Sequence, residues 1–494
     1  MNCTWAHPIL SGAETKALEQ RLFAGDESAE WQAMQRAGHA VASAILNDYR
    51  EIGGFPSAGR VLVLVGKGHN GGDALIACDE ILRRFPEAKA DVFFVYGAAS
   101  MRPLAQRAWH DLVHRHPTRV QSIRAMAANY DLSIDGVFGF QFRPPLDAVA
   151  IKTVAAANGL PVRMRAAVDL PSGIGEADAF RADFTYATGV VKREALECAN
   201  AGRLRYLDLG FFQSEAPHAD DLVITADVLS PLRTWRDPHS EKRRQGHLFV
   251  LAGSRGYPGA ALMAVTAALR SGAGLVSAFV PESLVPAFAA QVPEAIWIGW
   301  PETPDGGLAL EGIHLLRERM RQASALVMGP GMGREPETLA LAADVLKTLR
   351  VPVVVDADAL QPEVLAGAQT PLVLTPHAGE FKRIAGEKSL RDYAKASGVV
   401  VVLKGPITRM CAGGPVYHSL WGGPALARGG SGDLLAGIIG TQLARTPDEL
   451  LPAVCRGVAW HGRAADELAR TYGAEAVRTT QLLDFLPAAL RMGE

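Results

Sequence analysis

The chain has 494 residues, of which 48% are hydrophobic and 21% are charged, so it is too long for one ordinary core and suits two domains of roughly 200 and 270 residues. Its 50 Lys and Arg residues against 52 Asp and Glu leave a net charge of -2, which gives no electrostatic reason to expect nucleic acid or a membrane as a partner. Small molecules are the expected partners.

The cysteines and the N-terminal residues indicate the compartment. The five cysteines are scattered and form no CxxC pair, so they indicate neither a disulfide framework nor a thiolate zinc site; they are Cys3, Cys78, Cys198, Cys411 and Cys455. The first residues lack a basic stretch followed by an apolar one, and no uninterrupted apolar run approaches the ~18 residues needed to span a bilayer. We therefore expect a cytoplasmic protein without an export signal or a membrane anchor.

Short β-branched runs alternate with helical patterns along the whole chain. These runs are RVLVLVG, DVFFVYG, YDLSIDGV, VRMRAAVDL, HLFVLAG, GLVSAFVP, ALVMGPG, VPVVVDADAL and VVVVLKG. Continuous apolar strands separated by helices predict parallel sheets that are covered on both faces. A polar and charged stretch over 212–245 separates two such α/β domains. We place the join near Pro217 to Asp221, which gives domains over 1–217 and 218–494.

Three loops that follow strands in the first half carry polar side chains. The loop GKGHNGGDAL follows RVLVLV and contains GxGxxG, which alone indicates a dinucleotide site only weakly. The loops IDGVFGFQFRPP and VDLPSGI follow two later strands. Because the carboxyl ends of parallel strands gather ligands in open α/β sheets, we expect five side chains to converge on one crevice: Asn70, Asp73, Asp135, Asp169 and Ser172.

These three loops resemble the NAD(P)H-hydrate epimerase domain, whose patterns run approximately GxGNNGGDG, DxxFGxG and DxPSG, over residues 8–213. The resemblance implies a Rossmann-like three-layer αβα sandwich and a potassium ion held by Asn70, Asp135 and Ser172, whose oxygens suit a hard cation. It also implies Asp169 as the acid/base. The implied contacts to the hydrated dinucleotide are His69, Asn70, Gly71, Gly72, Asp73, Gly139, Phe140, Gln141, Phe142, Arg143, Pro144, Pro145 and Asp169.

Simpler interpretations exist for two of these residues, and the loop departs from the family pattern at two positions. Asp169 also suits a turn former at a strand end. His69 stands where the family has asparagine, and a lone loop histidine is commonly a solvated surface residue. Ala74 replaces a family glycine.

The second half contains six glycine-bearing blocks in order: LAGSRGYPGAALMA, SGAGLVS, MGPGMG, LTPHAGE, LKGPIT and ARGGSGD. In the last block three glycines precede Asp433 at the start of an apolar helical run. Glycines let backbone N–H groups approach a ligand closely, and a helix N-terminus favours negative charge. The block therefore predicts a hollow for a phosphate or an oxyanion, with Asp433 beside it as a general base. Alternatively, Asp433 only N-caps a helix that begins at Leu434.

Together the six blocks resemble the ADP- or ATP-dependent NAD(P)H-hydrate dehydratase domain, a branch of the ribokinase-like αβα fold, over residues 222–490. The resemblance implies hydrate contacts at Ala261, Gly331, Gly333, His377 and Asp433. It implies nucleotide contacts at Lys404, Gly405, Pro406, Ile407, Thr408, Gly429, Gly430, Ser431 and Gly432. Glu380 is a candidate magnesium ligand. The simpler interpretations are a strand-end charge for Lys404, a strand-end cap for His377 and pairing with a helix dipole for Glu380.

These observations predict one bifunctional enzyme of nicotinamide-dinucleotide repair. Its first domain would equilibrate the R and S hydrates of NADH or NADPH, and its second would dehydrate the S form with ADP or ATP and Mg²⁺. One alternative is a kinase for a small alcohol, with a first domain that only binds a dinucleotide or a protein partner. A dehydrogenase built on GKGHNG is the least favoured alternative. The expected partners are these small molecules and, in a homo-oligomer, further copies of the chain.

Overall fold

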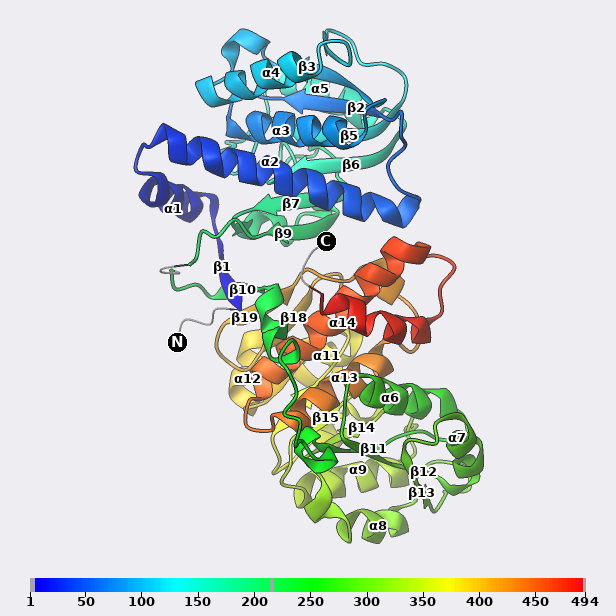
Figure 1. Cartoon of the computed structure of the whole chain (residues 1–494). Coiled ribbons are helices and arrows are strands. Elements are labelled where there is room, and N and C mark those ends of the chain that lie inside the picture. The colour runs from blue at the N-terminus through cyan, green and yellow to red at the C-terminus, as the bar shows by residue number, and fades with distance from the viewer. Residues whose placement is uncertain (1–4, 214–216, 492–494) are drawn as a thin grey trace. The chain divides into compact units, whose positions relative to one another are not determined.

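The computed structural model describes residues 5–213 and 217–491 (Figure 1). By its internal contacts the chain divides into two compact units. Unit 1 comprises Met1–Val223 and Ala469–Gly473, and unit 2 comprises Ile224–Leu468 and Ala474–Glu494.

Unit 1 contains a seven-stranded sheet whose neighbouring strands all run parallel, in the order β4-β3-β2-β5-β6-β7-β9. Its strands are β2 (Arg60–Val65), β3 (Lys89–Phe94), β4 (Val120–Ile123), β5 (Tyr130–Gly136), β6 (Val162–Val168), β7 (Phe184–Thr188) and β9 (Arg203–Leu207). Outside this seven-stranded sheet, β1 (Ala6–Leu10) pairs in parallel with β8 (Val191–Lys192).

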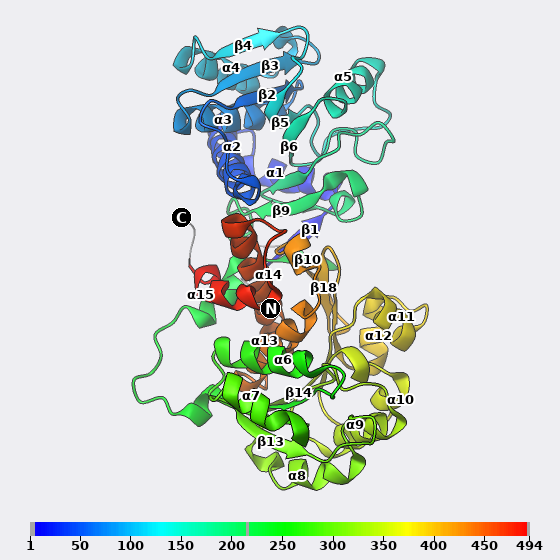
Figure 2. The ribbon, with the colours of Figure 1, turned by 90° about the vertical axis from the view of Figure 1, so that its right-hand side faces the viewer.

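Helices cover both faces of this sheet, as the apolar strands predicted. Along β2, Val61, Val63 and Val65 belong to the core cluster shared with α2, α3 and α4. Leu62 and Leu64 belong to the cluster shared with α5, because successive side chains of a strand point to opposite faces. Figure 2 shows α5 on the opposite side of the sheet from these three helices. The helices of unit 1 are α1 (Gly12–Phe23), α2 (Glu27–Tyr49), α3 (His69–Arg84), α4 (Pro103–Arg115) and α5 (Ala148–Asn158).

The strand order of unit 1 reverses between two central strands. From β2 the chain proceeds outward through β3 to β4, and then returns to β5 on the other side of β2. In open α/β sheets the loops diverge at such a reversal and leave a crevice beyond the carboxyl ends of the strands. The loops after β2, β5 and β6 therefore meet at this edge.

Unit 2 contains nine consecutive strands in the order β13-β12-β11-β14-β15-β16-β17-β18-β19. The expectation of parallel strands is correct for the first seven and wrong for β18 and β19, which run antiparallel as a hairpin after β17. These strands are β11 (His247–Leu251), β12 (Leu275–Pro281), β13 (Ile296–Trp300), β14 (Ala325–Met328), β15 (Val353–Val355), β16 (Leu372–Leu374), β17 (Val400–Leu403), β18 (Thr408–Cys411) and β19 (Val416–Ser419).

One face of the unit 2 sheet is covered closely by α13 and α6. A Cβ at Gly440 of α13 would lie 2.3 Å from Cγ2 of Val327, and one at Gly437 would lie 2.2 Å from the carbonyl oxygen of Ala264 in α6. These two glycines let α13 approach both neighbours. The opposite face packs against α9, α10 and α12. The helices are α6 (Pro258–Arg270), α7 (Val285–Gln291), α8 (Ile313–Arg317), α9 (Pro336–Thr348), α10 (Pro362–Leu365), α11 (Ala378–Ala385), α12 (Leu390–Ser397), α13 (Ser431–Arg445), α14 (Leu450–Tyr472) and α15 (Leu486–Ala489).

All nine predicted strands are present, and the predicted αβα architecture is confirmed in both units. Cys3 lies outside the described residues, and the other four cysteines carry free thiols. Within 5–213 and 217–491, no helix combines the length and the apolar character that crossing a bilayer requires.

Candidate active sites

The first glycine-rich loop of unit 1 is shorter than its sequence suggested. Helix α3 begins at His69 with Gly68 as its N-cap, so the predicted hydrate contacts from His69 to Asp73 occupy its first turns rather than a loop. His69 is half-buried rather than a solvated surface residue, and burial lowers the pKa of its imidazole. The NGGD segment is thereby held on a helix at the strand-order reversal.

The three predicted potassium ligands lie near the backbone of Phe138. Asn70 donates from Nδ2 to the Phe138 carbonyl at 3.0 Å, and the Phe138 N–H donates to Oγ of Ser172 at 2.9 Å. Asp135 accepts from Oγ and from N–H of Ser172 at 2.6 and 2.7 Å, and from the Val137 N–H at 3.1 Å. The structure therefore gathers the amide, the carboxylate and the hydroxyl that the resemblance implied.

Asp135 has the character of a buried anion without a countercharge. Its side chain is fully buried, and this burial raises its pKa to about 6 against the hydrogen bonds that favour the charged form. Among the described residues, none with a positive charge lies within ion-pair distance of it. The oxygens of Asn70, Asp135 and Ser172 therefore fit a hard monovalent cation.

Asp169 follows β6 in a left-handed conformation with φ of 66°, which is uncommon outside glycine. Its carboxylate accepts a hydrogen bond from the Phe140 N–H at 3.0 Å and pairs with the ammonium group of Lys192. Both side chains of this ion pair are at least 95% buried. Asp169 thus forms the turn that its DLPSG sequence suggested, and the same turn aims its carboxylate at the crevice.

Further acidic groups surround this ion pair. Burial raises the pKa of Glu19 to about 7, with the charge of Lys192 acting in the opposite direction. Burial likewise raises the pKa of Asp73 well above its ordinary value, and the neighbouring charges of Asp169 and Glu19 add to this effect. The crevice therefore places carboxyl groups with raised pKa values beside the carboxylate of Asp169, an arrangement suited to acid/base chemistry.

The predicted hydrate loop after β5 contacts this cluster only at its beginning. Phe140 donates its N–H to Asp169, and a Cβ at Gly139 would lie 3.0 Å from Oδ2 of Asp169. Phe142 is half-buried, while Gln141, Arg143, Pro144 and Pro145 are exposed. The contact of those five residues with a dinucleotide remains a prediction.

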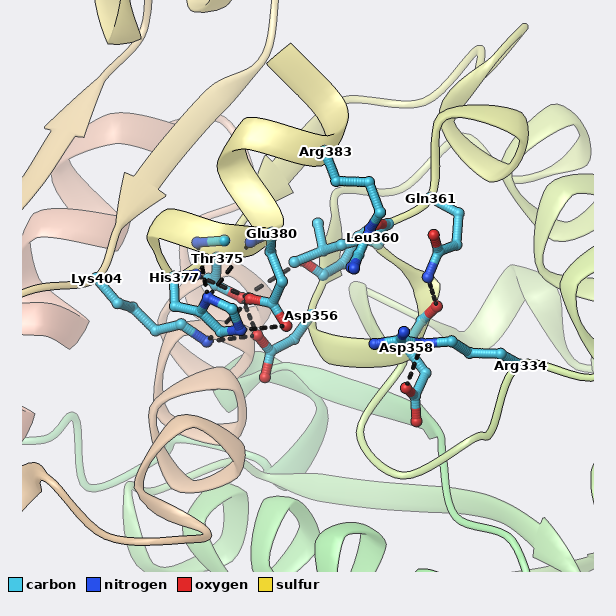
Figure 3. A network of polar contacts seen from close by, with 12 residues as sticks. Arg334, Asp356, Asp358, Leu360, Gln361, Thr375, His377, Glu380, Arg383 and Lys404 are labelled. Carbon is cyan, nitrogen blue, oxygen red and sulfur yellow. Dashed lines mark hydrogen bonds and ion pairs between the residues drawn. The ribbon is translucent and has the colours of Figure 1, made fainter. Parts of the chain in front are cut away.

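In unit 2 the carboxyl ends of three neighbouring strands bring together the second site (Figure 3). Asp356 follows β15, and its Oδ1 accepts from Thr375 Oγ1 at 2.7 Å and from Lys404 Nζ at 3.0 Å. Thr375 follows β16 and Lys404 follows β17. Lys404 Nζ also lies 4.0 Å from Oε2 of Glu380. Lys404 is therefore more than a strand-end charge, because two carboxylates hold its ammonium group.

Asp433 lies in the first turn of α13 and does not cap it. The helix begins at Ser431, two residues before Asp433, and its N-cap is Gly430 with φ of 91°. The alternative that Asp433 caps a helix starting at Leu434 is therefore wrong. The first-turn N–H groups of a helix have no intrahelical partner, so the segment from Gly430 to Asp433 presents donors and a carboxylate together. A Cβ at Gly432 would lie 3.3 Å from Nζ of Lys404, which places the glycine loop beside the lysine.

The electrostatics of this site favour a general base. Burial raises the pKa of Asp433 to about 7, repulsion from Asp356 and Asp358 adds to the shift, and Lys404 opposes it. Burial alone would lower the pKa of Lys404, but Asp356 and Glu380 raise it overall. Asp433 is thus poised to exchange a proton near neutral pH while Lys404 stays charged.

The remaining predicted contacts of unit 2 flank this centre. The Gly333 N–H donates to Asp358 at 3.1 Å, and a Cβ at Gly331 would lie 2.7 Å from the Tyr257 carbonyl, next to α6. Ala261 is fully buried in α6, where its side chain offers no accessible surface. The predicted nucleotide segment of Lys404, Gly405, Pro406, Ile407 and Thr408 forms the turn from β17 into β18, and Gly429 precedes the N-cap of α13.

His377 and Glu380 form the capping box of α11. Nδ1 of His377 accepts from the N–H groups of Gly379 and Glu380 at 3.0 and 3.3 Å, and Glu380 Oε2 accepts from the His377 N–H at 2.8 Å. This bond occupies one oxygen of the Glu380 carboxylate, and the role of Glu380 as a magnesium ligand remains a prediction. Across the described residues, no three His, Cys, Asp or Glu side chains are grouped to hold a metal ion.

Sequence analysis missed the partners that position the two candidate catalytic aspartates. Lys192 stands in VVKREAL without a recognisable motif, and β8 is only two residues long. Asp356 and Asp358 lie in VPVVVDADAL, which was interpreted only as a strand. A polar residue directly after a buried parallel strand is the signal that would have identified Asp356.

Two family models match the chain. The model described as NAD(P)H-hydrate dehydratase matches residues 248–488, and the model described as YjeF-related protein N-terminus matches residues 30–194. The first includes the Asp433 site and the second includes the Asp169 site.

Curated relatives match over nearly the whole chain. A bifunctional NAD(P)H-hydrate repair enzyme of Gloeobacter violaceus is 36% identical and covers 97% of each chain. An enzyme of the same description from Moorella thermoacetica is 34% identical over 93% of this chain and 92% of its own. Among solved structures, a ribokinase-like superfamily protein from Enterococcus faecalis is 27% identical over 54% of this chain and 94% of its own, with a TM-score of 0.48. With relatives of this identity and coverage, the chain belongs to the family of bifunctional NAD(P)H-hydrate repair enzymes.

Proposed function

We propose that unit 1 interconverts the R and S epimers of hydrated NADH or NADPH, and that unit 2 dehydrates the S epimer with ADP or ATP. The products of unit 2 are NADH or NADPH, phosphate, and AMP or ADP. The names of the full-length relatives support this activity. The observation that carries it is Asp433, with a pKa of about 7, in the first turn of α13 beside Lys404. The small-alcohol kinase is not favoured, because these relatives are repair enzymes along their whole length.

In the proposed dehydration, Asp433 takes the proton from the hydroxyl group of the hydrated ring. The oxygen of that hydroxyl group attacks the terminal phosphoryl group of the nucleotide. The bond between that phosphorus and the nucleotide breaks, and the nucleotide leaves with one phosphate fewer. The N–H groups at the start of α13 and the ammonium of Lys404 stabilise the charge on the transferred group. The phosphorylated oxygen then leaves the ring as phosphate, a ring proton is lost, and the reduced dinucleotide is restored.

In the proposed epimerisation, Asp169 serves as the acid/base of unit 1. Its carboxylate is held by the Phe140 N–H and by Lys192, so it meets a bound hydrate in one orientation. The raised pKa values of Glu19 and Asp73 supply protonated carboxyl groups next to it. A kinase-like site accepts one hydroxyl configuration for in-line transfer. Epimerisation in unit 1 would therefore supply unit 2 with the reactive form.

Two ions belong to this proposal. Asn70, Asp135 and Ser172 would hold potassium, which would neutralise the buried Asp135 and fix the loop around Phe138 against Asn70. Magnesium would enter with ADP or ATP and neutralise part of the phosphate charge. Glu380 is a candidate ligand of this ion, and no step of the proposal depends on that residue. We also propose a homo-oligomer in the cytoplasm.

The test uses the full chain with the S hydrate of NADH, magnesium, and ADP or ATP, and follows the absorbance of regenerated NADH. Asp433→Asn keeps the size of the side chain and is expected to slow this reaction by about 10³-fold, within the range for removing a general base. Asp169→Asn is the matched control, expected to leave S-hydrate dehydration intact and to abolish interconversion of the epimers. Equal rates for the wild type and Asp433→Asn would contradict the assignment of unit 2.

A further inference from the structure

A second polar hollow lies in unit 2 at the other end of α13. Two adjoining pockets of about 310 and 360 Å³ share five lining residues, among them Gln245 and Arg445. Arg445 is the last residue of α13, twelve residues after Asp433, and at 1.5 Å per residue this separates the two by roughly 18 Å along the helix. The hollow is therefore distinct from the site proposed for dehydration.

Guanidinium groups dominate the lining. The guanidinium groups of Arg236 and Arg445 both lie next to Gly272. A Cβ at Gly272 would lie 3.1 Å from Nη2 of Arg236 and 4.0 Å from Nη1 of Arg445. Arg456 lines the larger pocket and is 5% exposed. Burial lowers the pKa of Arg445, and the charges of Arg236 and Arg456 lower it further. Positive charges held this close together repel one another and destabilise the folded protein unless an anion binds between them.

The carboxylates nearby do not balance this charge. Five arginines line the two pockets: Arg236, Arg244, Arg270, Arg445 and Arg456. Asp237, Asp484 and Glu449 lie within ion-pair distance of Arg244, Arg270 and Arg456 respectively. Among the described residues, no carboxylate lies within that distance of Arg236 or Arg445. Two positive charges therefore remain, which matches the charge of about -2 on a phosphate monoester near neutral pH.

Two buried side chains that line the larger pocket carry polar atoms without a hydrogen-bond partner. Gln442 lines the larger pocket with 0% exposure, and neither Oε1 nor Nε2 of its amide has a hydrogen-bond partner. Nε of Arg456 is likewise buried without a partner. Leaving such buried groups unsatisfied destabilises the folded protein. The two N–H donors suit phosphate oxygens, whereas Oε1 of Gln442 needs a donor such as a hydroxyl group.

Capping of the helix dipole does not explain these features. A single arginine in the last turn would complement the C-terminal carbonyls of α13, and Arg445 alone would suffice. Arg236 comes from the segment before β11 and Arg456 from α14, so three separate segments supply the charge. We propose that this hollow binds the phosphate monoester of a hydroxylated small molecule, with Arg236, Arg445 and Arg456 on the phosphate and Gln442 on the phosphate and an adjacent hydroxyl.

The test is calorimetric titration of the full chain with ribose 5-phosphate. The wild type is expected to bind with a dissociation constant in the micromolar to millimolar range. Arg445→Gln and the exposed Arg236→Gln are each expected to weaken binding by about 10-fold or more, because each removes a charge-assisted hydrogen bond. Arg243→Gln, an exposed arginine of the same segment that does not line the hollow, is the matched control and is expected to bind as the wild type does.

Three results would overturn the proposal: no binding to the wild type, binding to both variants with wild-type affinity, or equal weakening by the control. Inorganic phosphate is the second probe, and its binding is expected to be weaker because it lacks the adjacent hydroxyl. Equal affinity for ribose 5-phosphate and inorganic phosphate would overturn the proposal that the ligand is a phosphate ester. Arg236 is exposed and lies outside both active sites. If the Arg236→Gln variant epimerises and dehydrates at the wild-type rates, it is folded.

Discussion

The two active sites of this protein each set an aspartate beside a lysine at the carboxyl ends of parallel strands, but they connect the pair differently. In unit 1, Lys192 pairs directly with Asp169, and both are buried. In unit 2, Lys404 pairs with Asp356 at 3.0 Å, while Asp433 stands apart from any ion pair among the described residues.

The difference explains how one fold class serves two kinds of proton transfer. A direct ion pair with Lys192 fixes the orientation of the Asp169 carboxylate. In unit 2, the lysine is occupied by Asp356, so burial and the repulsion of Asp356 raise the pKa of Asp433 to about 7. The second arrangement places a carboxyl group with a pKa of about 7 at the helix end where phosphate charge would develop in the proposed dehydration.

Among the variants that change the partners of the two aspartates, the largest expected effect comes from removing the lysine of the direct pair. Lys192→Met leaves Asp169 buried and unpaired, and we expect epimerisation to fall by about 10²-fold or more while dehydration of the S hydrate is unchanged. The measurement is the rate of interconversion of the purified epimers. Lys152→Met, an exposed lysine of α5, is the control. A variant that epimerises at the wild-type rate would show that the ion pair is only structural.

Removing the acid that holds the other lysine tests the indirect arrangement. Asp356→Asn removes a repelling charge from Asp433 and frees Lys404, so the pKa of Asp433 should fall from about 7. We expect the acid limb of the pH–rate profile of dehydration to move down by about one unit, and the rate at pH 8 to drop about 10-fold.

Thr375→Val is the matched control for this variant, because it removes the hydrogen bond of 2.7 Å to Asp356 without changing a charge. It should lower the rate less and leave the position of the acid limb unchanged. If the acid limb of the pH–rate profile does not move in Asp356→Asn, Asp356 does not set the pKa of Asp433.

A smaller effect is expected on stability. The pKa of Asp433 is raised from 3.8 to about 7 in the folded protein, so the folded state binds more protons than the unfolded state between these values. Stability contributed by this group is present below pH 4 and is lost as the pH rises to 7. Asp433→Asn should therefore increase the free energy of unfolding at pH 8 by about 1–2 kcal/mol, after allowance for solvent screening.

Urea unfolding at pH 8 and pH 4 checks this expectation, with the exposed Asp448→Asn as the surface control. The stabilisation should vanish at pH 4. An equal gain at both pH values would mean that the charge of Asp433 is not its cause.

The smallest expected effect concerns potassium. If a cation joins Asn70, Asp135 and Ser172, replacing tetramethylammonium by potassium should raise the midpoint of thermal unfolding of unit 1 by about 2–4 °C. Asn70→Ala and Asp135→Asn should each abolish the increase, since each removes a proposed ligand. Scanning calorimetry in the two salts measures the shift of the unfolding midpoint. An undiminished increase in both variants would place the ion elsewhere.

Much of both sites was predictable because their residues stand in recognisable blocks at strand ends. The loop sequences placed Asn70, Asp135 and Ser172 together correctly, and α13 does begin within GGSGD. The exact start of α13 could not be read, because glycines suit a loop and a helix N-terminus equally. The hairpin of β18 and β19 was missed, since short strands carry little periodicity.

The sequence by itself determined two αβα domains, the family, and the two aspartates, because strand periodicity and the spacing of glycine loops are local properties of the chain. Only the tertiary structure decided which charged side chains lie close to one another. Lys192, Asp356 and Lys404 come from separate strands, and only the order of those strands in the sheets brings them within reach of Asp169 and Asp433. The pKa values follow from burial and from those distances, neither of which is written in local sequence.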